Sequence, residues 1–154
     1  MANEHHTSHQ FDAELEAIKS HVLAMGGLVE RQIEDALIAI IDADSQRAEE
    51  VIAREKQVNG LELSVDEEAT RILGRRQPAA SDLRLVLVIT KAVGDLGRIG
   101  DESKKSAKRA RKRGEEGPAP RGCFEVRHSG AAVREMRHDT LDAFTRLDVD
   151  AALE

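Results

Sequence analysis

Aromatic side chains are almost missing from this 154-residue chain, which contains three Phe and neither Trp nor Tyr. β-Sandwiches and β-barrels normally use more aromatic and β-branched residues, so this composition favours helices. Long hydrophobic runs are missing too: the longest purely apolar segment, residues 36–41, is far shorter than the roughly 20 residues that a membrane-spanning helix needs. We therefore expect an all-α protein that does not itself cross a membrane.

The chain also has little cysteine and lacks the pattern of a signal peptide. Cys123 is the single cysteine, so no internal disulfide can form, and this usage suits a reducing cytoplasm. No charged and then apolar leader opens the chain, so we expect no secretory signal. The formal net charge of -6 argues against a dedicated nucleic-acid binder. We expect a cytoplasmic protein that does not bind nucleic acid.

Apolar residues recur at spacings of three and four along three long stretches, which is the pattern of amphipathic helices. Asp44 or Ser45 can cap the second stretch, and Pro78 separates the second from the third. Three long helices with short turns should pack antiparallel as an elongated bundle. The predicted core positions are Phe11, Leu15, Ile18, Val22, Met25, Val29, Ile33, Leu37 and Ile40, then Val51, Ile52, Val58, Leu61, Val65, Ala69 and Ile72, then Leu83, Val86, Thr90, Val93, Leu96, Gly100, Ser103 and Ala107.

These patterns divide the chain into four segments. Residues 1–9 are polar and aperiodic, which predicts a flexible tail. Residues 10–113 contain the three-helix bundle, and residues 114–125 have the composition of a linker. Residues 126–154 contain a fourth amphipathic pattern followed by the start of another helix.

Three glycines, Gly94, Gly97 and Gly100, fall within one predicted helix. Each glycine in a helix interior costs about 1 kcal/mol relative to alanine. They can let a neighbouring helix approach closely, or they can leave room for something bound between helices. Both interpretations remain open at this point.

Acidic residues beside the predicted core are the best candidates for a site. Glu62 and Asp66 are four residues apart and so lie on one face of the second helix. Asp101 lies next to Gly100, beside the core face of the third helix. Facing carboxylates on adjacent helices can hold a metal ion, whereas a solvated acidic face is the alternative. Glu62, Asp66 and Asp101 are therefore hypothetical metal ligands.

No catalytic constellation is apparent, because Ser81, Ser103 and Ser106 have no histidine-containing neighbourhood and Cys123 lies in a linker. No phosphate-cradling loop is present either. We expect a binding protein and not an enzyme. Residues 104–113 contain seven Lys or Arg, which can contact nucleic acid or acidic phospholipid. The run lacks interleaved aromatic residues for base stacking, so a solvated helix end is favoured.

The segment VNGLELSVDEEATRILGRRQPAASDLRLVLVITKAVGDLGRIGDES resembles the PhoU family of phosphate-signalling regulators. The similar motifs are residues 59–68, the arginine-rich turn at residues 75–84 and the DLGRIGD stretch at residues 95–101. The segment HTSHQFDAELEAIKSHVLAMGGLVERQIEDAL is also similar to the first helix of the family. The resemblance covers roughly residues 1–105.

The resemblance implies a negative regulator of the phosphate-starvation response and of phosphate uptake. Family members act as cytoplasmic adaptors that contact a sensor histidine kinase and the ATPase of a phosphate importer, so this chain would reach the membrane through its partners only. Some members bind metal ions through acidic motifs, which makes a metal-binding bundle the alternative function. Carried over, those motifs are Glu62 with Asp66, and position 97 with Asp101. Gly97 replaces the expected acid, so a site for divalent or iron- or zinc-type ions should be weakened.

The family is built of two similar three-helix bundles, so residues 126–154 look like the beginning of an incomplete second bundle. Its fourth amphipathic pattern leaves an apolar stripe through Val133, Met136, Leu141 and Phe144. An exposed apolar stripe favours association. We therefore expect a homodimer.

Overall fold

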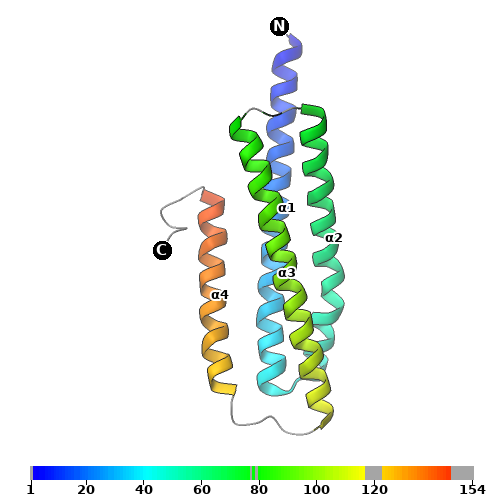
Figure 1. Ribbon diagram of the computed structural model, residues 1–154, viewed down its shortest axis with the longest axis vertical. Helices are drawn as coiled ribbons and strands as arrows, with labels where there is room; N and C mark the ends of the chain where they lie inside the picture. The colour runs from blue at the N-terminus through cyan, green and yellow to red at the C-terminus, as the bar shows by residue number, and fades with distance from the viewer. Residues whose placement is uncertain (1, 77, 79, 117–122, 147–154) are drawn as a thin grey trace.

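In the computed structural model, three of four helices form an elongated antiparallel bundle, and the fourth lies beside it (Figure 1). The helices are α1 (Ala2–Asp42), α2 (Ser45–Arg76), α3 (Ala80–Glu116) and α4 (Cys123–Arg146). The structure describes residues 2–76, 78, 80–116 and 123–146. The predicted all-α class and three-helix bundle are confirmed.

The bundle core is an apolar cluster that α1, α2 and α3 contribute together. Met25, Val58, Val65 and Val93 are fully buried in it. A second cluster near the α1–α2 turn consists mostly of alanines, which allow the helices to approach closely there. Over the described residues, no helix has both the length and the apolar character needed to cross a membrane.

One predicted core position is wrong: Leu83 is 37% exposed. The buried face at the start of α3 is set by Val86 and Ile89, both fully buried. With 3.6 residues per turn, Leu83 lies roughly 120° around the helix from Ile89. It therefore lies on the flank of the buried face instead of facing the core.

The turn between α1 and α2 depends on a left-handed residue and a side-chain cap. Ala43 has a φ of 52°, and the backbone N–H of Asp44 donates to the carbonyl of Ala39 at 3.1 Å. Asp44 Oδ1 accepts from the backbone N–H of Arg47 at 2.9 Å, so Asp44 is the N-cap of α2. This hydrogen bond holds the pKa of Asp44 below its ordinary value.

Helix ends differ from the predicted segment boundaries. A flexible tail was predicted over residues 1–9, but α1 begins at Ala2. The helix can extend this far because lengthening a packed helix needs no new nucleation. α3 ends at Glu116 and α4 begins at Cys123, so both extend into the predicted linker. The predictions for residues 117–122 and for a further helix in residues 147–154 lie outside the described residues.

Helix α4 packs against α1 alone among the described elements. Two glycines make this contact close: Leu141 of α4 lies over Gly26 of α1, and Leu37 of α1 lies over Gly130 of α4. Leu141 therefore packs on α1, whereas the sequence predicted that it belongs to an exposed apolar stripe. Val133 and Met136 remain exposed, whereas the side chain of Phe144 lies outside the described part.

Candidate functional site

Gly97 gives a carboxylate room between α2 and α3. A Cβ placed on Gly97 would lie 2.5 Å from Oε2 of Glu62, closer than real Cβ contacts. The Glu62 carboxylate therefore occupies the space that a side chain at position 97 would need. Any other residue at this position has to displace Glu62, whose side chain can rotate.

Gly100 likewise lies close to side chains of α2, about one turn further along α3. A Cβ there would lie 3.2 Å from Cγ1 of Val58 and 3.4 Å from Oε2 of Glu55. Gly97 and Gly100 thus let α2 approach closely, with two of its carboxylates over them, which agrees with the first interpretation of the glycines. Room for a bound group stays a prediction. A Cβ on Gly94 would meet nothing within 4 Å, so that glycine needs another explanation.

Glu55 is a buried carboxylate, 1% exposed, in a polar network that joins α1 to α2. Its Oε2 accepts from Nε2 of Gln32 at 3.1 Å, and the same amide donates to the carbonyl of Val51 at 3.0 Å. Its Oε1 is buried, and no described residue donates a hydrogen bond to it. A buried acceptor without a donor is rare and costly, so it needs an explanation.

The electrostatics connect Glu55 and Glu62 to the α3 carboxylate. Burial raises the pKa of Glu55; the hydrogen bond from Gln32 opposes this rise and the charge of Asp101 adds to it. Burial likewise raises the pKa of Glu62, with further contributions from Asp66 and Asp101. The charge of Asp101 therefore acts on two α2 carboxylates whose charged forms are both disfavoured.

The three predicted metal ligands share the α2–α3 face, but to different depths. Glu62 is partly buried over Gly97, whereas Asp66 and Asp101 are exposed. Within the described residues, no three His, Cys, Asp or Glu side chains are arranged so that they can hold a metal ion. The assignment of Glu62, Asp66 and Asp101 as ligands stays a prediction.

Glu55 was missed by the sequence analysis, although a signal was present. It lies four residues after Val51 and three before Val58, so it stands at a core position of α2. Gln32 has the corresponding place in α1, three residues after Val29. A charged or amide residue at core spacing is informative, because such groups are buried only with partners.

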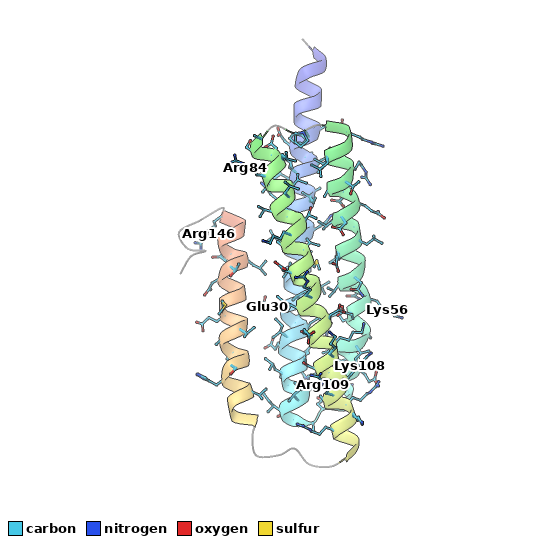
Figure 2. The ribbon with its side chains drawn as sticks, in the orientation of Figure 1. Glu30, Lys56, Arg84, Lys108, Arg109 and Arg146 are labelled. Atoms are coloured by element: carbon cyan, nitrogen blue, oxygen red, sulfur yellow. The ribbon has the colours of Figure 1, made fainter. Side chains whose placement is uncertain are left out.

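The basic run lies on the last turns of α3, and Figure 2 shows Lys108 and Arg109 there. Part of the run is neutralised locally: Arg111 pairs with Glu49 at 2.5 Å, and Lys105 pairs with Glu102 at 2.6 Å. The run is therefore a partly neutralised helix surface.

Known proteins resemble this chain in sequence and in structure. The PhoU domain family matches residues 22–110, which is more than half of the chain. The phosphate-specific transport system accessory protein PhoU homolog of Pseudomonas putida is 58% identical over 149 residues, which are 97% of this chain and 58% of that protein. The corresponding Pseudomonas aeruginosa protein is also 58% identical, over 97% of this chain and 62% of its own length.

A solved structure has the same fold. The crystal structure of PhoU from Pseudomonas aeruginosa superposes with a TM-score of 0.90 at 57% sequence identity, over 93% of this chain and 68% of that one. The chain thus spans about three fifths of the length of the two relatives from Pseudomonas, 58% and 62%.

Proposed function

Because the chain belongs to the PhoU family, we propose that it is an accessory regulator of phosphate transport that dampens phosphate uptake and the phosphate-starvation response. The observation that carries the proposal is the family match over residues 22–110, which include all of α2, the second half of α1 and most of α3. The relatives are named as accessory proteins of a transport system. The proposal therefore assigns binding, and no catalysed reaction, to this chain.

The proposed mechanism is that of a cytoplasmic adaptor between a phosphate-importer ATPase and a sensor histidine kinase. Exposed apolar side chains on the outer faces of the bundle support it, because such residues supply the core of protein–protein interfaces. Leu63 on α2 is 61% exposed, and Leu87 on α3 is 54% exposed. Regulation then requires that the partner binds more tightly in one of its two states. In this adaptor role the chain reaches the membrane through these partners.

A pull-down from solubilised membranes of phosphate-replete cells tests this adaptor role. The expected result is enrichment of a sensor histidine kinase or an importer ATPase by the chain, with less enrichment by the variants Leu63→Asp and Leu87→Asp. Ala131→Asp is the matched control, because it adds the same charge at an exposed position of α4. If a full-length relative enriches the partners and this chain does not, the chain lacks the regulatory contact.

Self-association through α4 is part of the same proposal. Val133 and Met136 are 50% and 68% exposed, and a second copy can cover them. Light scattering should show a homodimer that Met136→Asp dissociates and Ala131→Asp does not. A monomer at the concentrations of the pull-down would contradict this.

Metal binding is a second candidate function, and the orphaned Oε1 of Glu55 favours it. The donor set fits a hard divalent cation or an iron- or zinc-type ion in kind, because Glu62, Asp66 and Asp101 offer carboxylate oxygens. Binding requires these side chains to rearrange, since they do not converge on one point. Gly97, which replaces an acid, weakens the site.

Elemental analysis of untagged protein tests this second function. The expected result is an ion at stoichiometric level that Asp101→Asn removes and Glu67→Gln retains, because Glu67 is an exposed carboxylate of the same helix α2 outside the cluster. Protein that holds no ion after incubation with manganese, iron or zinc would eliminate the metal-binding function and leave the adaptor role intact.

A further inference from the structure

A cavity of about 170 Å³ lies beside the last turns of α3. Ile40 of α1 and Ser106, Arg109, Ala110 and Arg113 of α3 line it. The spacing of Ser106, Arg109 and Arg113 along α3 places their side chains on one face of the helix. The lining therefore combines one hydroxyl and two guanidinium groups with an apolar floor.

Among the described residues, neither arginine forms a direct ion pair with a carboxylate, although the charge of Arg109 helps to lower the pKa of Glu102. The carboxylate that lines the adjoining cavity, Glu102, is held by Lys105 at 2.6 Å. Like charges four residues apart on a helix repel each other, and Arg109 and Arg113 have this spacing. An anion bound between them would remove the repulsion.

The two arginines also stand on a well-anchored part of α3. A Cβ on Gly114 would lie 2.7 Å from Oγ of Ser45 and 3.2 Å from the carbonyl oxygen of Ala43, so the end of α3 packs against the α1–α2 turn. Ala110, between the two arginines, is only 5% exposed. The backbone that carries the guanidinium groups is therefore held in place before any ligand binds.

We propose that Ser106, Arg109 and Arg113 form a binding site for a phosphoryl oxyanion, carried by inorganic phosphate or by the head group of an anionic phospholipid. Guanidinium groups donate paired hydrogen bonds that match the geometry of phosphate oxygens, and the hydroxyl adds a neutral donor. A water molecule occupies about 30 Å³ in the liquid, so the cavity has room for a tetrahedral anion. This site does not depend on the partner contacts proposed above.

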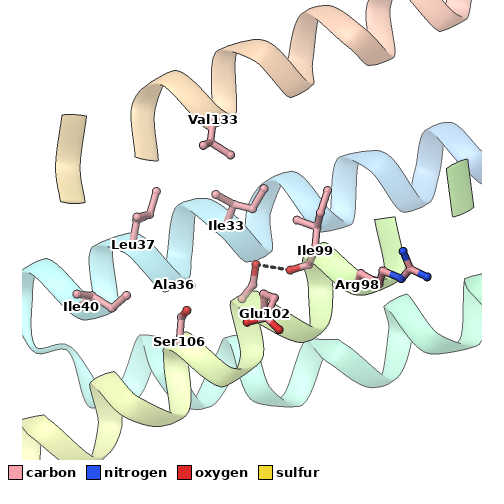
Figure 3. Close-up of a pocket in the computed structure, with 10 residues that line it drawn as sticks. Ile33, Ala36, Leu37, Ile40, Arg98, Ile99, Glu102, Ser106 and Val133 are labelled. Carbon is pink, nitrogen blue, oxygen red and sulfur yellow. Dashed lines mark hydrogen bonds between the residues drawn. The ribbon is translucent and has the colours of Figure 1, made fainter. Parts of the chain in front are cut away.

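The cavity continues into an apolar groove, which distinguishes the two sources of the oxyanion. Ile40 and Ser106 also line a cavity of about 330 Å³ between α1, α3 and α4, where Val133 faces Leu37 across the space (Figure 3). A phospholipid can place its phosphate at the arginines and an acyl chain in this groove. Inorganic phosphate needs the arginines and Ser106 alone.

Calorimetric titration of the full chain with inorganic phosphate, at constant ionic strength, is the first arm of the test. The second arm measures co-sedimentation with vesicles of phosphatidylcholine, with and without phosphatidylglycerol. The double variant Arg109→Gln with Arg113→Gln should weaken binding about tenfold or more, because charge-assisted hydrogen bonds are lost. The control, Lys108→Gln with Lys112→Gln, removes the same charge at the same spacing outside the cavity and should change binding about twofold or less.

Circular dichroism spectra first have to show that all variants are folded. Each binding result then supports or overturns the proposal. Phosphate binding that the arginine variant loses assigns the site to the free anion, and binding to anionic vesicles alone assigns it to the head group. Equal losses in both double variants would mean non-specific attraction and overturn the proposal. Binding in neither arm would overturn it as well, even if a phosphoserine peptide bound.

Discussion

Replacing Gly97 with alanine tests whether the Glu62 carboxylate really occupies the space above α3. Alanine in place of glycine stabilises a helix interior by about 1 kcal/mol. The new Cβ would lie 2.5 Å from Oε2 of Glu62, so the side chain has to leave its position at a cost of about 0.5–1.5 kcal/mol. The two effects nearly cancel, and Gly97→Ala should leave the free energy of unfolding almost unchanged.

Gly94→Ala is the matched control, because its Cβ would meet nothing within 4 Å. This variant should show the full gain of about 1 kcal/mol. In a Glu62→Ala background, Gly97→Ala should also show that gain, which makes the coupling energy between the two positions about 0.5–1.5 kcal/mol.

Urea unfolding followed by circular dichroism provides these free energies. The reasoning is refuted if Gly97→Ala stabilises the chain as much as Gly94→Ala does. It is equally refuted if Glu62→Ala leaves the effect of Gly97→Ala unchanged, because the carboxylate would then not be the group that the new Cβ meets.

Three further predictions concern the core, the cap and the fourth helix. Glu55→Gln should stabilise the chain by about 1–2 kcal/mol at neutral pH. Burial raises the pKa of Glu55, so the parent chain loses stability as the pH rises from the ordinary glutamate range through that raised pKa. In acid the carboxyl is neutral, and the difference in stability between the parent and Glu55→Gln should vanish. Urea unfolding at several pH values measures the stability of both proteins. Asp44→Ala should lower the free energy of unfolding by removing the N-cap, and Asp42→Ala should not. The pKa of Asp44 is lowered in the fold, so this loss should disappear as the pH falls through that lowered pKa. Gly26→Ala should loosen the packing of α4 on α1, because its Cβ would lie 2.6 Å from Leu141. Hydrogen exchange of backbone amides should then become faster in α4 alone. The control Gly27→Ala, whose Cβ would meet nothing within 4 Å, should leave the exchange in α4 unchanged.

The site was only partly predictable because its decisive features are contacts between helices. The four-residue spacing of Glu62 and Asp66 predicted that both lie on one helix face, and they do. The same spacing rule could not say that Glu62 lies over Gly97, which depends on how α2 and α3 are aligned. Glu55 was not predicted to be buried, because a glutamate at core spacing is normally an exception. Its partner, the Gln32 amide, lies on another helix and satisfies only Oε2.

Local periodicity by itself determined the helical class, the bundle of three long helices and most of its buried positions, because a 3.6-residue repeat of apolar side chains specifies one buried face. Asp44 and Pro78 marked two of the turns for equally local reasons. Only the tertiary structure decided that α4 packs on α1 through Gly26 and Gly130, and that Ser106 and two arginines share a cavity with Ile40. Those arrangements depend on the relative position of helices far apart in the chain, which no local repeat encodes.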